Sequence, residues 1–249
     1  MVQITMISVL FLMTDSFCLW KTQFTEQTFS MPSNWQITGA YSGNRVSNCQ
    51  GQNIVGGFNI VGSGSVIRGT YSNIPRHSAI KVRLKVYYID SWDTEDASIS
   101  AGGFVTSRTW YLDWGPSNVC GAGYKDGVIW ETLQGAHTAE TLTITLNPHG
   151  LDESADNESL GLKNVEIYLK PIQCIQFFTE CDYTGTMKEF CEDSPNQDRR
   201  NIPQKIKSIK MHGCGKVTLT KKGLGSITIT ENVSCLTEFD FPPVENLNR

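Results

Sequence analysis

Residues 77–95, HSAIKVRLKVYYIDSWDTE, decide the fold class. In the first half of this stretch, apolar residues occupy every even position from 80 to 88, and basic residues occupy positions 81, 83 and 85. This period of two predicts a β-strand with one buried face and one solvated face. The second half places three carboxylates within six residues around Trp92. Carboxylates so close together repel one another unless water or a cation screens them, so this acidic turn is the first candidate site.

The composition supports an all-β chain. It is rich in glycine, serine, threonine and isoleucine, and no long stretch of it has a helical period. The formal net charge of −4 argues against a nucleic-acid partner, because such partners usually need a clustered basic face. The one basic cluster, six lysines between positions 205 and 222, lies on expected strands and turns, where we expect it to be a solvated face.

The chain divides into two expected domains. Short apolar strands separated by glycine, serine, asparagine and proline fill residues 22–171, and this pattern predicts a β-sandwich of the jelly-roll type. Pro171 marks the end of this domain. Residues 173–240 then form a second domain that is too small to be held by its core alone, so we expect disulfide cross-links in it. Residues 241–249 are a polar tail.

The N-terminal segment is a short apolar run. Residues 1–13, MVQITMISVLFLM, contain no charge. We interpret residues 1–18 as a secretory signal peptide, and the alternative is a buried first strand. No later segment is long and apolar enough to cross a bilayer, so we expect no integral membrane segment after signal removal.

The cysteines indicate an oxidising compartment. The chain has eight, without a CxxC pair or a neighbouring histidine that would suggest zinc, so we expect disulfides. Cys49 and Cys120 are the only two in the first domain and should pair with each other. The second domain holds Cys174, Cys181, Cys191, Cys214 and Cys235. The odd cysteine has Cys18 as a partner if signal cleavage falls before that residue, and is otherwise free or intermolecular.

Two loops of the first domain carry a resemblance to known proteins. Residues 89–95 read IDSWDTE, and residues 151–167 read LDESADNESLGLKNVEI. These loops resemble a domain of secreted ciliate proteins, which is itself similar to galactose-binding-like jelly rolls. The resemblance implies a jelly-roll fold for the first domain.

The second domain resembles a βγ-crystallin. CIQFFTECDYTG at residues 174–185 is similar to the first hairpin of a crystallin Greek key, and IPQKIKSIKM at residues 202–211 to the strand that carries the serine of each motif. The resemblance implies a small, disulfide-stapled Greek-key domain. Of the crystallin calcium motif only Ser208 is present, so we expect no calcium in this domain. Proteins with such a domain are similar to cargo of ciliate secretory granules, which implies a secreted protein or one of the granule lumen.

The acidic loops of the first domain favour calcium. In a jelly roll two such loops can meet at one end of the sandwich, and oxygen ligands from both suit calcium rather than a transition metal. The expected ligands are Asp90, Asp93, Glu95, Asp152, Asp156 and Glu158. The alternative is that these residues are solvated loop acids.

Two asparagines and two histidines are further candidates for a functional role. Asn157 and Asn232 begin glycosylation sequons, and a glycan on Asn157 would crowd the proposed calcium loop. His77 and His137 each precede a long strand without a nucleophile motif nearby, so we expect them to make backbone hydrogen bonds rather than to catalyse.

The expected function is non-enzymatic. We expect a structural or adhesive component of a secretory granule or extracellular matrix, stabilised by calcium and acting through self-association. The alternative is a calcium-dependent carbohydrate-binding lectin, in which an exposed tryptophan stacks on a sugar. A third hypothesis is a glycosidase that uses a carboxylate pair such as Asp90 and Glu158.

Overall fold

The computed structural model describes residues 7–12, 17–193, 206–214, 216–221 and 225–236. The described chain folds into two compact units, one of Leu19–Leu169 and one formed by the described parts of Met1–Cys18 and Lys170–Arg249. Strands and a single turn of 3-10 helix, η1 (Leu112–Trp114), make up the regular structure of the described residues. The all-β prediction is confirmed. Among the described residues, no helix is long and apolar enough to span a lipid bilayer.

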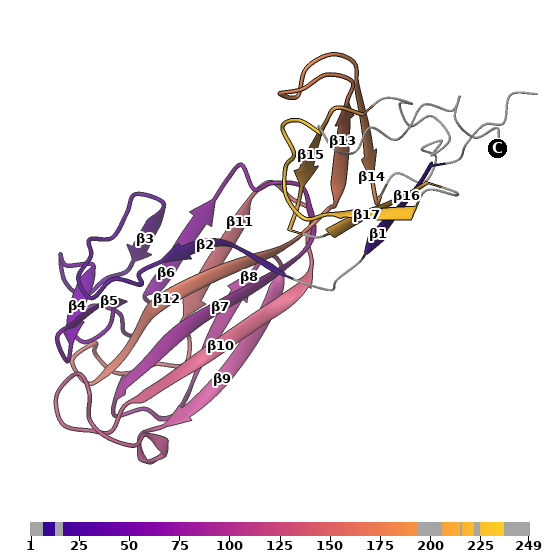
Figure 1. Ribbon diagram of the computed structural model, residues 1–249. Helices are drawn as coiled ribbons and strands as arrows, with labels where there is room; N and C mark the ends of the chain where they lie inside the picture. Colours follow the sequence, from indigo (N-terminus) through magenta and orange to yellow (C-terminus); the bar gives the residue numbers. More distant parts are fainter. Residues whose placement is uncertain (1–6, 13–16, 194–205, 215, 222–224, 237–249) are drawn as a thin grey trace, which may run out of the picture. The chain divides into compact units, whose positions relative to one another are not determined.

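The larger unit is a sandwich of two sheets, which confirms the β-sandwich prediction (Figure 1). One sheet has the order β10-β7-β12-β5-β4, with β2 also paired to β12, and the other has the order β3-β6-β11-β8-β9. The strands are β2 (Cys18–Gln23), β3 (Trp35–Thr38), β4 (Val46–Cys49), β5 (Gln52–Gly56), β6 (Val66–Tyr71), β7 (His77–Asp90), β8 (Asp93–Ala101), β9 (Phe104–Tyr111), β10 (Gly127–Ala136), β11 (Leu142–Asn147) and β12 (Glu158–Pro171).

Strand β7 alternates as its sequence predicts. Its fully buried apolar residues between the two sheets are Ile80, Val82, Leu84, Val86 and Tyr88. The basic side chains at positions 81, 83 and 85 are half-buried on the opposite side of the sheet, which we call the outer face. At one end of β7 this outer face is covered, because Tyr87 and Ile89 pack there with Ile54 and with Cys49 and Cys120.

Strand β12 changes its inward-facing positions along its length. Leu160 and Leu162 lie in the main core, and Val165, Ile167 and Leu169 lie there too. The first two have even numbers and the others odd numbers, so an extra residue is inserted between them. Residue 164 has a positive φ of 52°, and its N–H donates to the carbonyl oxygen of residue 24 at 3.1 Å. A β-bulge at this position accounts for the change.

The smaller unit contains two three-stranded antiparallel sheets. The first has the order β14-β13-β15, built from β13 (Cys174–Phe178), β14 (Met187–Cys191) and β15 (Ser208–His212). The second has the order β1-β16-β17, built from β1 (Ile7–Leu12), β16 (Lys216–Lys221) and β17 (Gly225–Ile229).

Ser208 connects β15 to the loop that follows β13. Its hydroxyl donates to the carbonyl oxygen of Glu180 at 2.6 Å and accepts from the N–H of Tyr183 at 3.0 Å. Asp182 and Tyr183 in this loop both have positive φ values. Because the buried serine satisfies two backbone groups of this loop, it holds the loop in its folded shape.

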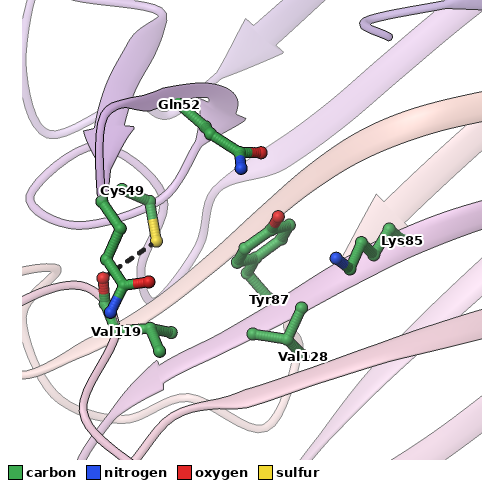
Figure 2. Close-up of a pocket in the computed structure, with 7 residues that line it drawn as sticks. Cys49, Gln52, Lys85, Tyr87, Val119 and Val128 are labelled. Carbon is green, nitrogen blue, oxygen red and sulfur yellow. Dashed lines mark hydrogen bonds between the residues drawn. The ribbon is translucent and has the colours of Figure 1, made fainter. Parts of the chain in front are cut away.

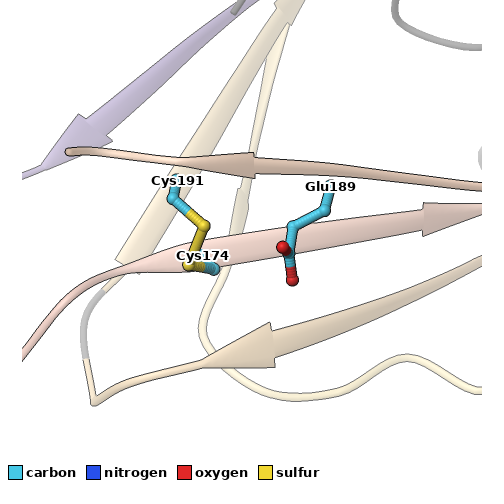
Figure 3. A group of neighbouring side chains, drawn as sticks. All are labelled: Cys174, Glu189 and Cys191. Atoms are coloured by element: carbon cyan, nitrogen blue, oxygen red, sulfur yellow. A yellow bond between two sulfur atoms is a disulfide. The ribbon is translucent and has the colours of Figure 1, made fainter. Parts of the chain in front are cut away.

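Four disulfides include all eight cysteines. Cys49–Cys120 belongs to the larger unit, and the other three belong to the smaller one: Cys18–Cys214, Cys174–Cys191 and Cys181–Cys235. Cys174 and Cys191 face each other across the paired strands β13 and β14 (Figure 3).

Residues 7–12, the described part of the apolar N-terminal segment, lie in a sheet. Strand β1 pairs antiparallel with β16, from Ile7 opposite Lys221 to Leu12 opposite Lys216. A first strand was the alternative to a signal peptide, and removal of residues 1–18 stays a prediction. The disulfide to Cys214 adds a condition, because cleavage after Cys18 would leave Cys214 without its partner.

Candidate functional site

Three of the predicted calcium ligands lie together. One carboxylate oxygen from each of Asp93, Glu95 and Glu158 lies within 4.8 Å of the other two. Asp93 and Glu95 belong to the start of β8, and Glu158 is the first residue of β12. The two acidic loops of the sequence therefore contribute to one cluster of carboxylates.

Glu158 is the buried member of this cluster. Its side chain is 1% exposed, and burial raises its pKa to about 7, with the negative charges of Glu95, Glu153 and Asp152 adding to the effect. Burial is also the main cause of the raised pKa of Glu95, and a hydrogen bond with the Asp93 side chain raises this pKa further. Protonation relieves the repulsion among these groups, and a divalent cation bound by the three carboxylates would relieve it in the same way.

The other three predicted ligands have different environments. Asp152 and Asp156 are exposed, and Asp156 accepts a hydrogen bond from the hydroxyl of Ser154. Asp90 is fully buried, and its carboxylate accepts from the backbone N–H of Ala122 at 3.0 Å and of Gly123 at 3.2 Å. The structure thus places the Asp90 carboxylate against the loop before β10.

Asp126 holds the same loop, although no motif in the sequence marks it. Its Oδ2 accepts from the N–H of Val119 at 2.6 Å and of Cys120 at 2.7 Å, and its Oδ1 accepts from the N–H of Asp90 at 2.9 Å. Burial raises the pKa of Asp126, and these three backbone bonds act against that rise. The two buried aspartates therefore fix the backbone of residues 119–124.

This loop forms one wall of a pocket on the outer face of the sheet (Figure 2). The pocket has a volume of about 240 Å³. Its lining residues are Cys49, Gln50, Gln52, Lys85, Tyr87, Val119 and Val128. Figure 2 shows the ring of Tyr87 between the amide of Gln52 and the side chain of Val128, with the Lys85 ammonium pointing toward that ring. The ammonium nitrogen lies 5.8 Å from the ring centroid.

Two restraints fix the side of the pocket that the β4–β5 hairpin forms. The Cys49–Cys120 disulfide joins this hairpin to the wall that carries Val119. Gln50 and Gly51 form the two-residue turn of the hairpin, with φ values of +50° and +78°. Glutamine is an uncommon residue in this left-handed region, and such backbone strain is concentrated at functional sites.

Beyond the pocket, the outer face carries two more pairs of a basic side chain and an aromatic ring. The guanidinium carbon of Arg83 lies 4.8 Å from the ring centroid of Trp130, whose side chain is 40% exposed. Arg83 also forms an ion pair with Glu166 at 3.1 Å. The ammonium of Lys81 lies 4.6 Å from the ring centroid of Tyr168. Trp130 is opposite Lys85 in the β10–β7 register, so this exposed ring adjoins the pocket.

The two histidines considered for catalysis lie against each other. The rings of His77 and His137 stack with centroids 5.0 Å apart, and Nε2 of His77 lies 2.7 Å from Nδ1 of His137. Nδ1 of His77 donates to the carbonyl oxygen of Pro75 at 2.6 Å. Burial lowers the pKa of His137, and the neighbouring His77 lowers it further.

The two predicted glycosylation sites differ in exposure. Asn157 is half-buried, and its Oδ1 accepts from the hydroxyl of Ser91 at 2.7 Å. Asn232 is exposed, and its Oδ1 accepts from the N–H of Met211 at 2.7 Å. Glycosylation of either residue stays a prediction.

A second group with metal-ligand atoms occurs in the smaller unit. Ligand atoms of Cys174, Glu189 and Cys191 lie within 4.8 Å of one another (Figure 3). The two sulfur atoms form a disulfide, so neither is a thiolate that could hold a metal ion.

Comparisons with known proteins give only distant likenesses. No family model matches the sequence, and no curated protein matches it. Among solved structures, the chain is similar to the CBM22-1 xylan-binding domain of Xyn10C from Paenibacillus barcinonensis, with a TM-score of 0.38 and 10% identity over 63% of this chain and 97% of that one.

Two other solved structures show likenesses of the same order. The K3 cleaved adhesin domain of Lys-gingipain from Porphyromonas gingivalis has a TM-score of 0.38 and 10% identity over 61% of this chain and 99% of that one. The C-terminal CBM6 of LamC, a laminarinase from Zobellia galactanivorans, has a TM-score of 0.33 and 14% identity over 54% of this chain and 99% of that one. At these scores the likenesses carry no functional argument, and the function must be argued from the site itself.

Proposed function

We propose that the larger unit is a non-catalytic carbohydrate-binding module and that its sugar site is the pocket on the outer face. The observation that carries this proposal is the lining of the pocket, which combines an aromatic ring, two amide side chains and an ammonium group within about 240 Å³. This volume lies below the range of about 300–1,000 Å³ typical of drug-sized ligands, so it suits a single sugar ring.

The chemistry of the lining matches that of a sugar. A pyranose presents hydroxyl groups, which both donate and accept hydrogen bonds, around a ring whose C–H faces are apolar. The amides of Gln50 and Gln52 supply donors and acceptors. The ring of Tyr87 is only 5% exposed and forms part of the pocket floor, and the neighbouring exposed ring of Trp130 supplies an apolar surface for stacking. None of the seven lining residues has a carboxylate, so the pocket lacks the carboxylate pair that glycosidases use.

The pocket is held in place before any ligand enters. The disulfide to Cys120 and the bonds from Asp126 fix its Val119 wall, and the two-residue turn fixes Gln50. A site that is already ordered loses less conformational entropy when it binds, which supports recognition of a weakly binding ligand such as a sugar.

Calcium has a supporting role in this proposal. The cluster of Asp93, Glu95 and Glu158 offers three carboxylates, which are the ligands that calcium prefers. Bound calcium would fix the start of β8 to the start of β12. Asp93 lies three residues after Asp90, so this would also steady the aspartate that holds the loop of the pocket.

Glycan binding is tested on the full chain with its disulfides formed. A glycan array of neutral and acidic oligosaccharides identifies a ligand, and calorimetric titration measures its affinity for the wild type and for Gln52→Ala. Gln134→Ala is the matched control, because this exposed glutamine lies on β10 outside the pocket. We expect Gln52→Ala to weaken binding about tenfold and Gln134→Ala to leave it unchanged. An array without any binding, or equal affinities for the two variants, would contradict the proposal.

A structural or adhesive role in an extracellular or secretory-granule matrix is a second candidate. The four disulfides fit an extracellular protein, and three of them lie in the small second unit, as expected of a durable assembly module. Analytical ultracentrifugation with and without calcium tests it. Reversible calcium-dependent self-association would support this role, and a monomer under both conditions would speak against it.

A further inference from the structure

Lys85 brings a positive charge into the proposed sugar pocket. Its half-buried side chain lines the pocket beside Tyr87, and no carboxylate among the described residues lies within ion-pair distance of it. Because no carboxylate of the described residues pairs with it, this ammonium is available to an anionic ligand. The whole chain has a formal net charge of −4, so the positive charge of the pocket is opposite in sign to that of the protein as a whole.

A second ammonium acts on the same region. Lys163 is 3% exposed, and its ammonium donates to the carbonyl oxygens of Glu26 at 2.6 Å and Asn53 at 3.3 Å. Burial lowers the pKa of Lys163, the positive charge of Lys85 lowers it further, and the negative charge of Glu26 acts in the opposite direction. An anion bound beside Lys85 would offset this effect of its charge.

We propose that the pocket binds an acidic sugar residue, one that carries a carboxylate or a sulfate group, and that Lys85 contacts this anion. The proposal rests on the proposed carbohydrate-binding function and adds the charge of the ligand to it. Charge complementarity supports it, since the lining offers a cation and no carboxylate. The amides of Gln50 and Gln52 would then contact the hydroxyl groups of the same sugar.

The outer face beside the pocket would let the protein bind several sugar residues of an acidic polysaccharide. Arg83 and Lys85 stand on one side of β7, about 7 Å apart as alternate residues of a strand. The exposed ring of Trp130 lies opposite Lys85 and offers a stacking surface for a second sugar. Arg83 is already paired with Glu166, so Lys85 is the residue that should respond most to the charge of the ligand.

Matched glycans that differ only in charge test the proposal. Oligogalacturonate is compared with its neutral methyl ester, and a sulfated galactan with its desulfated form, by calorimetric titration of the full chain at low and at physiological salt. The pairs also separate carboxylate from sulfate as the recognised group. Lys85→Gln is the test variant. Lys81→Gln, on the same strand and face but outside the pocket, removes the same charge and is its control.

We expect at least one acidic glycan to bind about tenfold more tightly than its neutral partner, with Lys85→Gln removing the difference and Lys81→Gln keeping it within about twofold. Equal binding of acidic and neutral forms, or an unaffected Lys85→Gln, would overturn the acidic specificity and leave the carbohydrate-binding function standing. A DNA oligonucleotide that bound as tightly as the best acidic glycan would also overturn it, as general attraction of polyanions. Binding of no glycan at all would remove both proposals.

Discussion

The backbone N–H of Asp90 donates to Oδ1 of Asp126 at 2.9 Å, so the two aspartates that hold the loop before β10 are themselves connected. Asp126 binds the backbone of Val119 and Cys120, and Asp90 binds that of Ala122 and Gly123. Because Val119 lines the pocket, these buried carboxylates determine the position of one pocket wall.

Asp126→Ala should destabilise the larger unit and weaken sugar binding. The substitution leaves the three N–H groups of Asp90, Val119 and Cys120 without their acceptor, at a cost of about 1–3 kcal/mol each if no water replaces it. We expect the free energy of unfolding in urea to fall by about 3 kcal/mol. Asp152→Ala, at an exposed position, is the control and should change it little. Equal stability of the two variants would show that the Asp126 bonds contribute nothing.

Calcium should raise the melting temperature through Asp93 and not through Asp90. The carboxylate of Asp93 lies in the acidic cluster, whereas that of Asp90 binds the loop. A ligand at a hundred times its Kd stabilises by about 2.7 kcal/mol, or several degrees, in scanning calorimetry with calcium or with chelator. Asp93→Asn should lose this shift, and Asp90→Asn should lower both melting temperatures while keeping the shift. A wild type insensitive to calcium would end the metal proposal.

Without calcium, stability should fall as the pH rises from about 4.5 to about 7. The pKa of Glu158 is raised from 4.5 to about 7 in the folded protein, so over this window the folded state binds more protons than the unfolded state. Stability linked to this group is therefore present at low pH and lost as the pH rises. We expect Glu158→Gln to melt a few degrees higher than the wild type at pH 7.5 in chelator and not at pH 4. A difference in melting temperature that is constant with pH would contradict the assignment.

The mature protein should contain Cys18. This residue is the disulfide partner of Cys214, so any cleavage of the N-terminal segment that preserves the fold must occur before it. Mass spectrometry of the secreted chain should find an N-terminus at or before Cys18 and no free thiol. A chain that starts after Cys18 and has one reactive thiol would show that this disulfide is not part of the mature protein. The double variant Cys18→Ser with Cys214→Ser should lose about 2–4 kcal/mol of stability.

Gln50→Gly should separate folding from binding. The residue has a φ of +50°, where glycine carries no steric cost, and this gain offsets the larger entropy that glycine loses on folding. We expect a melting temperature within about 2 °C of the wild type and a clear loss of glycan affinity, because the amide is gone. Gly43→Ala, in a loop where an added Cβ meets no atom within 4 Å, is a control for backbone change. Unchanged affinity of Gln50→Gly would remove this amide from the site.

The sequence predicted the sheet well because the fold depends on alternation. The five alternating apolar positions of β7, from 80 to 88, are fully buried, and residues 49 and 120 are joined as the count of cysteines suggested. The turns were harder to predict, because the direction of a side chain there depends on backbone φ angles that the alternation of residues does not reveal. The short spacing of Asp90 and Asp93 predicts that their carboxylates share one site, yet the φ of +67° at Asp90 and its bonds to residues 122 and 123 place its carboxylate at another loop.

The pocket had no signal in the sequence because its residues come from separate segments. The β4–β5 hairpin, β7, the loop after η1 and β10 each contribute one to three lining residues, and none forms a motif. The basic residues of β7 were visible as the solvated half of an alternating strand. Their place beside an aromatic ring depends on strand pairing, which puts Trp130 opposite Lys85.

The bulge at Asn164 has a consequence for how this protein can vary. Leu162 and Val165 both face the core although they are three positions apart. The inward-facing positions of β12 are therefore even-numbered before residue 164 and odd-numbered after it. Deleting residue 164 would restore a plain alternation, which would move the core side chains of one half of the strand to the opposite face of the sheet. Relatives of this chain should therefore tolerate almost no change in the length of β12, and an alignment that closes a gap there would pair core residues with surface ones.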